Sequence, residues 1–215
     1  MDIIWYGLGC FSLTERGYPS LVTDPYDADR VGRARHLLTA DIVTSSRLLE
    51  EPWKATWPQV RGEPQTLAGP GEYEIGGVFV TGVASSRNRK REGPVDENIV
   101  YAVSYDGVVV CHLGELGRTL TQAQAEAIGR VTVLLVPVGV PGGLTHSMAA
   151  ETVSLVEPDI VVPMQYKLPG LKIDRKPVDG FLKEMGVTQP QELSVLKVAA
   201  GGEPEETQIV LLEPQ

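Results

Sequence analysis

The chain is poor in the residues that most often bind metal ions. Its 215 residues include three His and two Cys, and metal centres built on nitrogen and sulfur ligands draw on these two residue types. A centre with several metal ions is therefore difficult to assemble from this composition. Two Cys are also too few for a disulfide framework, so we expect a reducing, cytoplasmic location.

Long hydrophobic runs and an excess of positive charge are missing as well. The apolar runs have the length of strands, as at 131–136, and fall well short of the ~20 residues that a membrane span needs. The N-terminal stretch MDIIWYGLGC carries Asp2 and no basic segment, unlike a secretory signal. The formal net charge of -9 disfavours nucleic-acid binding, because phosphate backbones attract basic surfaces. We expect neither a membrane nor a nucleic-acid partner.

Turn-forming residues, by contrast, are abundant. The 23 Gly and 16 Pro divide the chain into short segments, as is typical of a strand-rich protein. The pairs Gly76-Gly77 and Asp106-Gly107 each separate two apolar runs and predict two β-hairpins. The length and the 42% hydrophobic content suit one domain over residues 1–215 with a single core.

Helices and buried strands alternate in the second half of the chain. Thr121 and Gln124 form a capping box that predicts a helix over 122–128. The run 131–137 is continuously apolar and β-branched, which indicates a strand buried on both faces. A helix at 147–156 and a second buried strand at 159–164 are expected to follow.

Three further segments complete the prediction. We expect 52–70 to be a loop, and 194–198 and 207–212 to pair with each other as closing strands. Hairpins followed by β-α-β units indicate two sheets with helices on their outer faces.

Several stretches of sequence, taken in order, resemble a known family. They read IIWYGLGCFSL (3–13), LVTDPY (21–26), GPGEYEIGGVFVTGV (69–83), CHLGELG (111–117), VLLVPVG (133–139) and IVVPMQY (160–166). Over about residues 3–212 the chain resembles the metallo-β-lactamase fold, in particular small metal-dependent hydrolases similar to L-ascorbate-6-phosphate lactonase. The resemblance implies an α/β (α+β) protein, a four-layer αββα sandwich of two mixed sheets flanked by helices, with the active site between the sheets at one edge.

The resemblance also locates the family's metal ligands, and most of them are replaced in this chain. In the family, a His-x-His-x-Asp-His stretch after a strand helps to hold one or two Zn²⁺ ions, which activate water. The corresponding ligand positions here are Arg47, Leu49, Glu51, Pro52, Arg87, Glu115 and Gln165. Guanidinium groups offer no lone pair, and Leu and Pro carry no donor atom. We therefore expect no metal and no cofactor, although zinc serves the wider family.

The carboxylates that remain predict how such an altered site is neutralised. Because unpaired buried charge is costly, we expect Arg47 and Arg87 to pair with Glu51 and Glu115 in a salt-bridge network. Asp24 matches a family position that supports the site from behind. The favoured function is a degenerate family member that binds or scaffolds without metal-dependent hydrolysis, within a homo-oligomer.

One alternative is a hydrolase with a rebuilt mononuclear or metal-free site. Its weak catalytic candidates are His112 and Glu115, and His146 would be a third metal ligand. Structural explanations compete with these roles, since His112 ends a buried strand and His146 begins a helix where solvent reaches it. His36 is most simply a surface residue.

A second alternative is a module that binds an anion or a phosphorylated metabolite. Guanidinium groups contact phosphate bidentately, and Arg47, Arg87 and Arg118 are the candidates for a small anionic ligand. Cys10 and Cys111 are more simply buried small hydrophobes than nucleophiles. The pair Ser45-Ser46 has no identifiable base in the nearby sequence, so we assign it no catalytic role.

Overall fold

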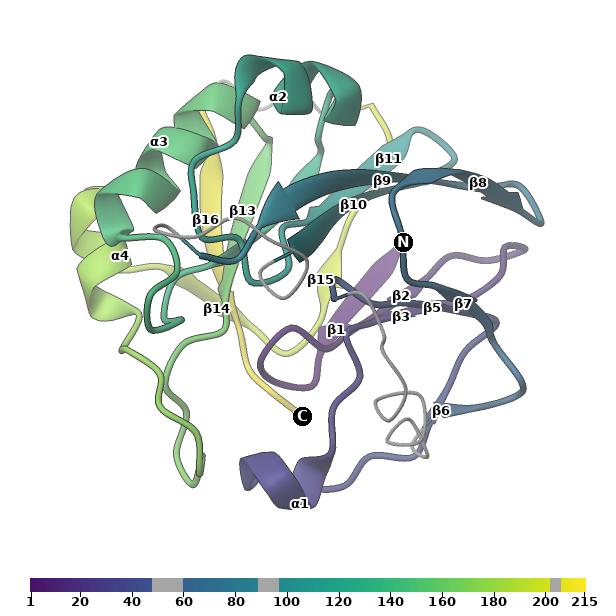
Figure 1. Cartoon of the computed structure of the whole chain (residues 1–215), viewed down its shortest axis with the longest axis horizontal. Helices are drawn as coiled ribbons and strands as arrows, with labels where there is room; N and C mark the ends of the chain where they lie inside the picture. Colours follow the sequence, from purple (N-terminus) through teal and green to yellow (C-terminus); the bar gives the residue numbers. More distant parts are fainter. Residues whose placement is uncertain (48–59, 89–96, 202–205) are drawn as a thin grey trace.

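Two mixed β-sheets face each other in the computed structural model, which describes residues 1–47, 60–88, 97–201 and 206–215 (Figure 1). A large apolar core lies between the sheets. Helices cover the outer face of the larger sheet, at the upper left in Figure 1. The α/β sandwich of two mixed sheets expected from the sequence is confirmed.

The smaller sheet is built largely from the first third of the chain. In spatial order it contains β15 (Leu196–Lys197), β1 (Asp2–Trp5), β2 (Phe11–Thr14), β3 (Leu21–Thr23), β5 (Ile42–Thr44) and β7 (Gln65–Leu67). β3, β5 and β7 are parallel, so the loops that follow β3 and β5 leave the sheet at the same edge. Its outer face packs near the short helix α1 (Ala28–Val31) and the ribbon of β4 (Leu38–Thr39) and β6 (Val60–Arg61).

The larger sheet contains both predicted hairpins. In spatial order it consists of β14 (Gln191–Leu193), β16 (Gln208–Leu212), β13 (Ile160–Met164), β12 (Val133–Pro137), β11 (Val108–His112), β10 (Glu97–Tyr105), β9 (Val78–Ser86) and β8 (Gly71–Ile75). The hairpin turns at Gly76-Gly77 and Asp106-Gly107 all have positive φ, the conformation that a two-residue type I′ turn requires. β12 is buried along its whole length, as its apolar run predicts.

Three helices pack on or beside the larger sheet. α2 (Gln122–Ile128) has the predicted capping box between Thr121 and Gln124. α3 (His146–Val156) contacts β12 and α2, and α4 (Asp179–Glu184) packs against α3. None of the helices in the described ranges combines the length and the apolar character of a membrane span.

Two local predictions are wrong. The segments 194–198 and 207–212 do not pair, because β15 joins β1 in the smaller sheet while β16 lies between β13 and β14 in the larger one. The part of 52–70 that the structure describes is not only a loop, since it contains β6 and β7. Both errors concern short strands whose partners are distant in sequence, which local patterns do not report.

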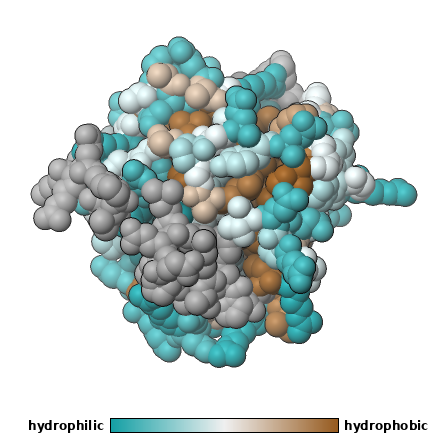
Figure 2. All heavy atoms as spheres, turned by 45° about the vertical axis from the view of Figure 1, so that its right-hand side comes forward, coloured by the Kyte–Doolittle hydropathy of each residue, from teal (hydrophilic) through white to brown (hydrophobic). Residues whose placement is uncertain are grey.

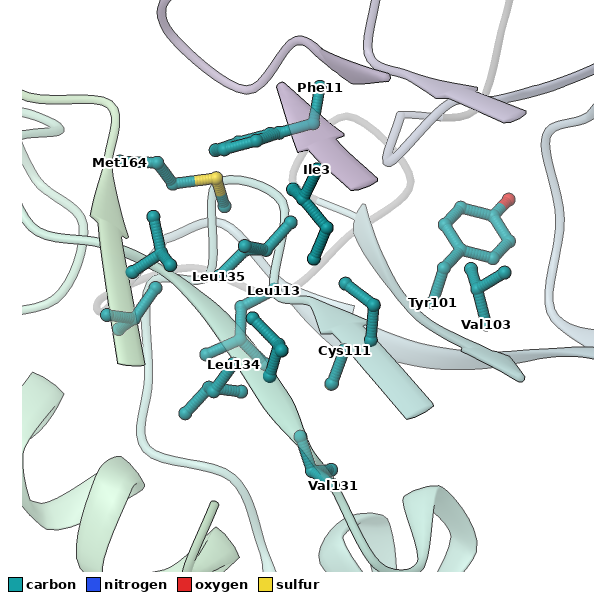
Figure 3. Packing of buried hydrophobic residues seen from close by; sticks show 14 of the residues in the cluster. Ile3, Phe11, Tyr101, Val103, Cys111, Leu113, Val131, Leu134, Leu135 and Met164 are labelled. Carbon is teal, nitrogen blue, oxygen red and sulfur yellow. The ribbon is translucent and has the colours of Figure 1, made fainter. Parts of the chain in front are cut away.

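The core is continuous between the two sheets. Ile3 and Phe11 of the smaller sheet project toward Leu135 and Met164 of the larger one (Figure 3), and all four side chains are fully buried. The molecular surface in Figure 2 is largely hydrophilic, with hydrophobic atoms gathered in limited areas. This packing holds the two sheets at a fixed separation and thereby positions the loops at their shared edge.

Candidate functional site

The loops that leave parallel strands of both sheets meet at one edge. Arg47 follows β5 and Asp24 follows β3 in the smaller sheet, while Glu115 follows β11 and Gln165 follows β13 in the larger one. Because parallel strands end at the same edge of a sheet, these loops converge between the sheets. This is the place where the sequence resemblance puts the active site.

Glu115 is the centre of a charged group that we call the Glu115 cluster. Its members are Glu115, Arg47, Arg87, Arg175 and Gln165. Arg47 Nη2 forms an ion pair with Glu115 Oε2, Arg87 Nη1 lies 3.6 Å from that oxygen, and Arg175 Nη2 donates to Oε1 at 2.9 Å. The predicted pairing of Arg47 and Arg87 with Glu115 is therefore confirmed.

Arg175 ties two of the mapped ligand positions together. Besides Glu115, it contacts Gln165 Oε1 through Nε at 3.2 Å and through Nη2 at 3.1 Å. Burial lowers the pKa of Arg175, and the charge of Glu115 opposes that shift. The sequence analysis missed Arg175, because it lies outside every motif that carries the resemblance and reaches the site through the fold.

The main chain holds Glu115 in place. Asn98 of β10 is fully buried, and its Oδ1 accepts a hydrogen bond of 2.8 Å from the backbone N–H of Glu115. Its Nδ2 donates to Leu113 O and to Ser85 Oγ. Because every polar group of this amide is satisfied, the turn that carries Glu115 is rigid.

His112 belongs to a separate group, the His112 cluster, formed by His112, Ser46, Gly9 and Gly114. The ring is 1% exposed. Gly114 N–H donates to Nδ1 at 3.2 Å, so Nε2 carries the proton and donates to Gly9 O at 2.9 Å. Burial lowers the pKa of His112, which agrees with a neutral ring that joins the two sheets.

Ser46, for which the nearby sequence offers no base, has an imidazole neighbour in the structure. Its Oγ lies 3.3 Å from His112 Nδ1, and Asp24 Oδ2 lies 4.0 Å from the same nitrogen. Ser46 is 1% exposed, and the Nδ1 lone pair already accepts from Gly114 N–H. A Ser-His-Asp triad needs an exposed hydroxyl and a base with a free lone pair, so this trio is structural.

Asp24 supports both clusters. Its Oδ1 accepts a hydrogen bond of 2.6 Å from the backbone N–H of Ser46, the residue before Arg47. Burial raises the pKa of Asp24, while the neighbouring His112 acts to lower it. Asp24 therefore fixes the main chain that leads to Arg47 and, through Oδ2, lies 4.0 Å from His112 Nδ1.

The backbone is strained at this edge. Leu8, Asp24 and Gln165 have φ values of 53°, 37° and 58°, in the left-handed region that residues with a side chain seldom occupy. A Cβ at Gly9 would lie 3.0 Å from Gln165 Nε2 and 3.2 Å from Asp24 Oδ2, so only glycine fits there without displacing a neighbour. Such concentrations of strain are typical of functional sites.

The donor set does not fit the zinc centre of the family. Among the residues that the structure describes, no group of three or more His, Cys, Asp and Glu side chains is placed to hold a metal ion. Glu115 is paired with guanidinium groups, Gln165 Oε1 accepts from Arg175, and both nitrogens of His112 are engaged. A dication at this place would have to displace these arginines.

The other two histidines have packing partners of their own. His146 begins α3 and packs so closely on α4 that a Cβ at Gly180 would be 2.1 Å from its Cε1. The mononuclear site proposed from His112, Glu115 and His146 therefore does not form. His36 is half-buried beside Tyr6, with ring centroids 5.1 Å apart, so it is not a simple surface residue.

The remaining candidates divide into two groups. Arg118 Nε donates to Asn88 O at 3.1 Å and thereby contacts the segment that carries Arg87. Leu49, Glu51 and Pro52 lie outside the described residues, so the predicted pairing of Glu51 stays a prediction. Cys10 and Cys111 are buried free thiols, and burial raises the pKa of both, which makes them poor nucleophiles.

Comparison with known proteins agrees with this architecture. A family model described as a β-lactamase superfamily domain matches residues 2–165. The chain belongs to this superfamily and has the metallo-β-lactamase fold.

Several proteins are similar to this chain in sequence or in structure. A UPF0173 protein of Pyrococcus furiosus is 30% identical over 182 residues, which cover 77% of this chain and 83% of that protein. A crystal structure from Thermotoga maritima is provisionally described as a Zn-dependent hydrolase of the metallo-β-lactamase superfamily. It is 33% identical to this chain with a TM-score of 0.79, and the match covers 98% of this chain and 97% of that chain. A metallo hydrolase from Ignicoccus hospitalis shares the fold. It is 17% identical with a TM-score of 0.63, and the match covers 92% of this chain and 99% of that chain.

Proposed function

We propose that this member of the superfamily is a degenerate one that binds a ligand, or scaffolds a partner, at the edge between its sheets without metal-dependent hydrolysis. One observation carries the proposal: Glu115 and Gln165, two positions that the resemblance maps to metal ligands, are both held by the guanidinium group of Arg175. A guanidinium group repels a metal ion and cannot coordinate one. Hydrolysis in this superfamily depends on metal-activated water, so the arginine cluster favours binding over catalysis.

Metal content is the direct test. The purified chain is incubated with zinc chloride, dialysed and analysed by elemental mass spectrometry, alongside Glu115→Gln and a surface control, Glu72→Gln, on the exposed β8. We expect zinc far below one ion per chain, with no difference among the three proteins. The proposal would be refuted if the unaltered chain and the Glu72→Gln protein held close to one zinc ion per chain and the Glu115→Gln protein did not.

The proposal extends to location and assembly. Two buried free thiols suit a reducing compartment, so we propose that the chain acts in the cytoplasm. We also propose a homo-oligomer, and Phe79 of β9, which is 54% exposed, is the apolar surface residue at which we test it. Light scattering on the chain and on Phe79→Ser tests this part, since a monomer in both preparations contradicts it.

A further inference from the structure

The Glu115 cluster has more positive than negative groups, and the excess is on its outer side. Three guanidinium groups, those of Arg47, Arg87 and Arg175, lie within 4 Å of the one carboxylate of Glu115. The charge of Arg47 acts unfavourably on that of Arg175. A second anion near Arg47 would relieve this repulsion.

Arg175 and Arg47 differ in how exposed they are and in how many hydrogen-bond partners they have. Arg175 is 11% exposed, and it donates to Glu115, to Gln165 and to the carbonyl oxygen of Asp174. Arg47 is 47% exposed, and it donates from Nη2 to Glu115. Within the described part of the chain, most of its five N–H groups have no other partner. Arg175 is thus fixed in place by its partners inside the cluster, whereas Arg47 is the arginine that a ligand can contact from solvent.

Arg47 is also held in position before any ligand arrives. Its backbone N–H contacts Ser45 Oγ at 3.3 Å, and the same hydroxyl donates to the carbonyl oxygen of Arg47 at 2.9 Å. The preceding residue, Ser46, is anchored by Asp24. A side chain whose main chain is fixed loses less entropy on binding.

From this geometry we propose that Arg47, with Arg87 beside it on Glu115 Oε2, binds the oxyanion group of a small molecule, a phosphate or a carboxylate. The planar guanidinium fork fits both groups bidentately. The carboxylate of Asp24 accepts from Ser46 N–H through Oδ1, and its Oδ2 lies 4.0 Å from His112 Nδ1. This inference rests on the proposed function, since a zinc ion at the same edge would bind the anion by other means.

The test measures anion binding by titration calorimetry at constant ionic strength, with inorganic phosphate and succinate as probes and with zinc content determined on the same samples. Four proteins are compared: the unaltered chain, Arg47→Gln, Arg47→Lys and Arg16→Gln. Arg16 is the matched control, because it is exposed in the turn between β2 and β3, at the opposite end of β2 from Gly9. Circular dichroism verifies that all four are folded.

We expect the unaltered chain to bind at least one probe and Arg47→Gln to bind it about tenfold or more weakly. Arg47→Lys, which retains the charge without the planar fork, falls between the two, and Arg16→Gln binds as the unaltered chain does. The tighter probe identifies the ligand as a phosphate or a carboxylate. Equal binding by Arg47→Gln overturns the inference.

The outcomes also separate this inference from the proposed function. A zinc-free chain that binds neither probe overturns the anion site and leaves the proposed function intact. A chain that carries stoichiometric zinc and loses phosphate binding when the zinc is removed overturns both.

Discussion

His112 ends β11 and Glu115 lies three positions later, in the turn that follows the strand, yet the structure uses the two residues in opposite ways. His112 is neutral, buried and hydrogen-bonded to backbone groups of both sheets. Glu115 is charged, 11% exposed and surrounded by arginines. The inner part of this edge therefore maintains the fold, while the outer part carries the charged groups at which we propose that a ligand binds.

The largest effect should come from the inner part. We expect His112→Ala to lower the free energy of unfolding by about 3 kcal/mol, because it removes a packed ring, leaves Gly114 N–H without its acceptor and removes one of the two donors to Gly9 O, which retains Thr23 Oγ1. Urea denaturation provides the measurement. The control is His36→Ala, at a half-buried ring, which should cost about 1 kcal/mol. Equal losses in the two variants would show that His112 is not a link between the sheets.

Loss of the central carboxylate should have the next largest effect. Glu115→Gln leaves the 11% exposed Arg175 without its counter-ion, so we expect a loss of about 2 kcal/mol in unfolding free energy. Glu72→Gln on the exposed β8 is the control, with a change below about 0.5 kcal/mol. A stabilised Glu115→Gln protein would mean that the arginines do not depend on this carboxylate.

The burial of His112 also predicts that the free energy of unfolding depends on pH. Burial holds the pKa of His112 below its usual 6.5, so the unfolded state takes up a proton first as the pH falls. This contribution of His112 to stability is then present above about pH 6.5 and decreases as the pH falls below that value. Asp24, whose pKa is raised above 3.8, acts with the opposite sign, because its stabilising effect is lost as the pH rises through its folded pKa.

The difference between the unaltered chain and His112→Gln, taken at each pH, isolates the contribution of the histidine. Chemical denaturation at several pH values measures it. A difference that does not change between pH 7 and 5.5 would contradict the neutral, buried imidazole.

The smallest effect on stability belongs to the outer part. Arg47 is 47% exposed, and ion pairs open to solvent contribute little, so Arg47→Gln should change the unfolding free energy by less than about 1 kcal/mol without a ligand. Thermal denaturation in an anion-free buffer measures this. A loss as large as that of Glu115→Gln would show that Arg47 is part of the fold and would remove the distinction between the two regions.

Local features of this chain were predictable because their causes are local. Asp106-Gly107 forms a turn with positive φ at both residues, and Thr121 caps α2 within four residues of chain. Each conformation depends on neighbours in sequence. The pairing of Arg47 with Glu115 was also predictable, but only through the resemblance, which placed both residues at one edge.

What the sequence determined by itself is the alternation of helices and buried strands over 122–164, the hairpin turns and the shortage of metal-binding side chains, since these follow from residue type and spacing. Only the tertiary structure decided that Arg175 reaches Glu115, that Ser46 meets His112, and that β15 and β16 belong to different sheets. These contacts join residues 60 or more positions apart or depend on distant strand partners. Their energy comes from burial and charge in the assembled fold, which no local pattern encodes.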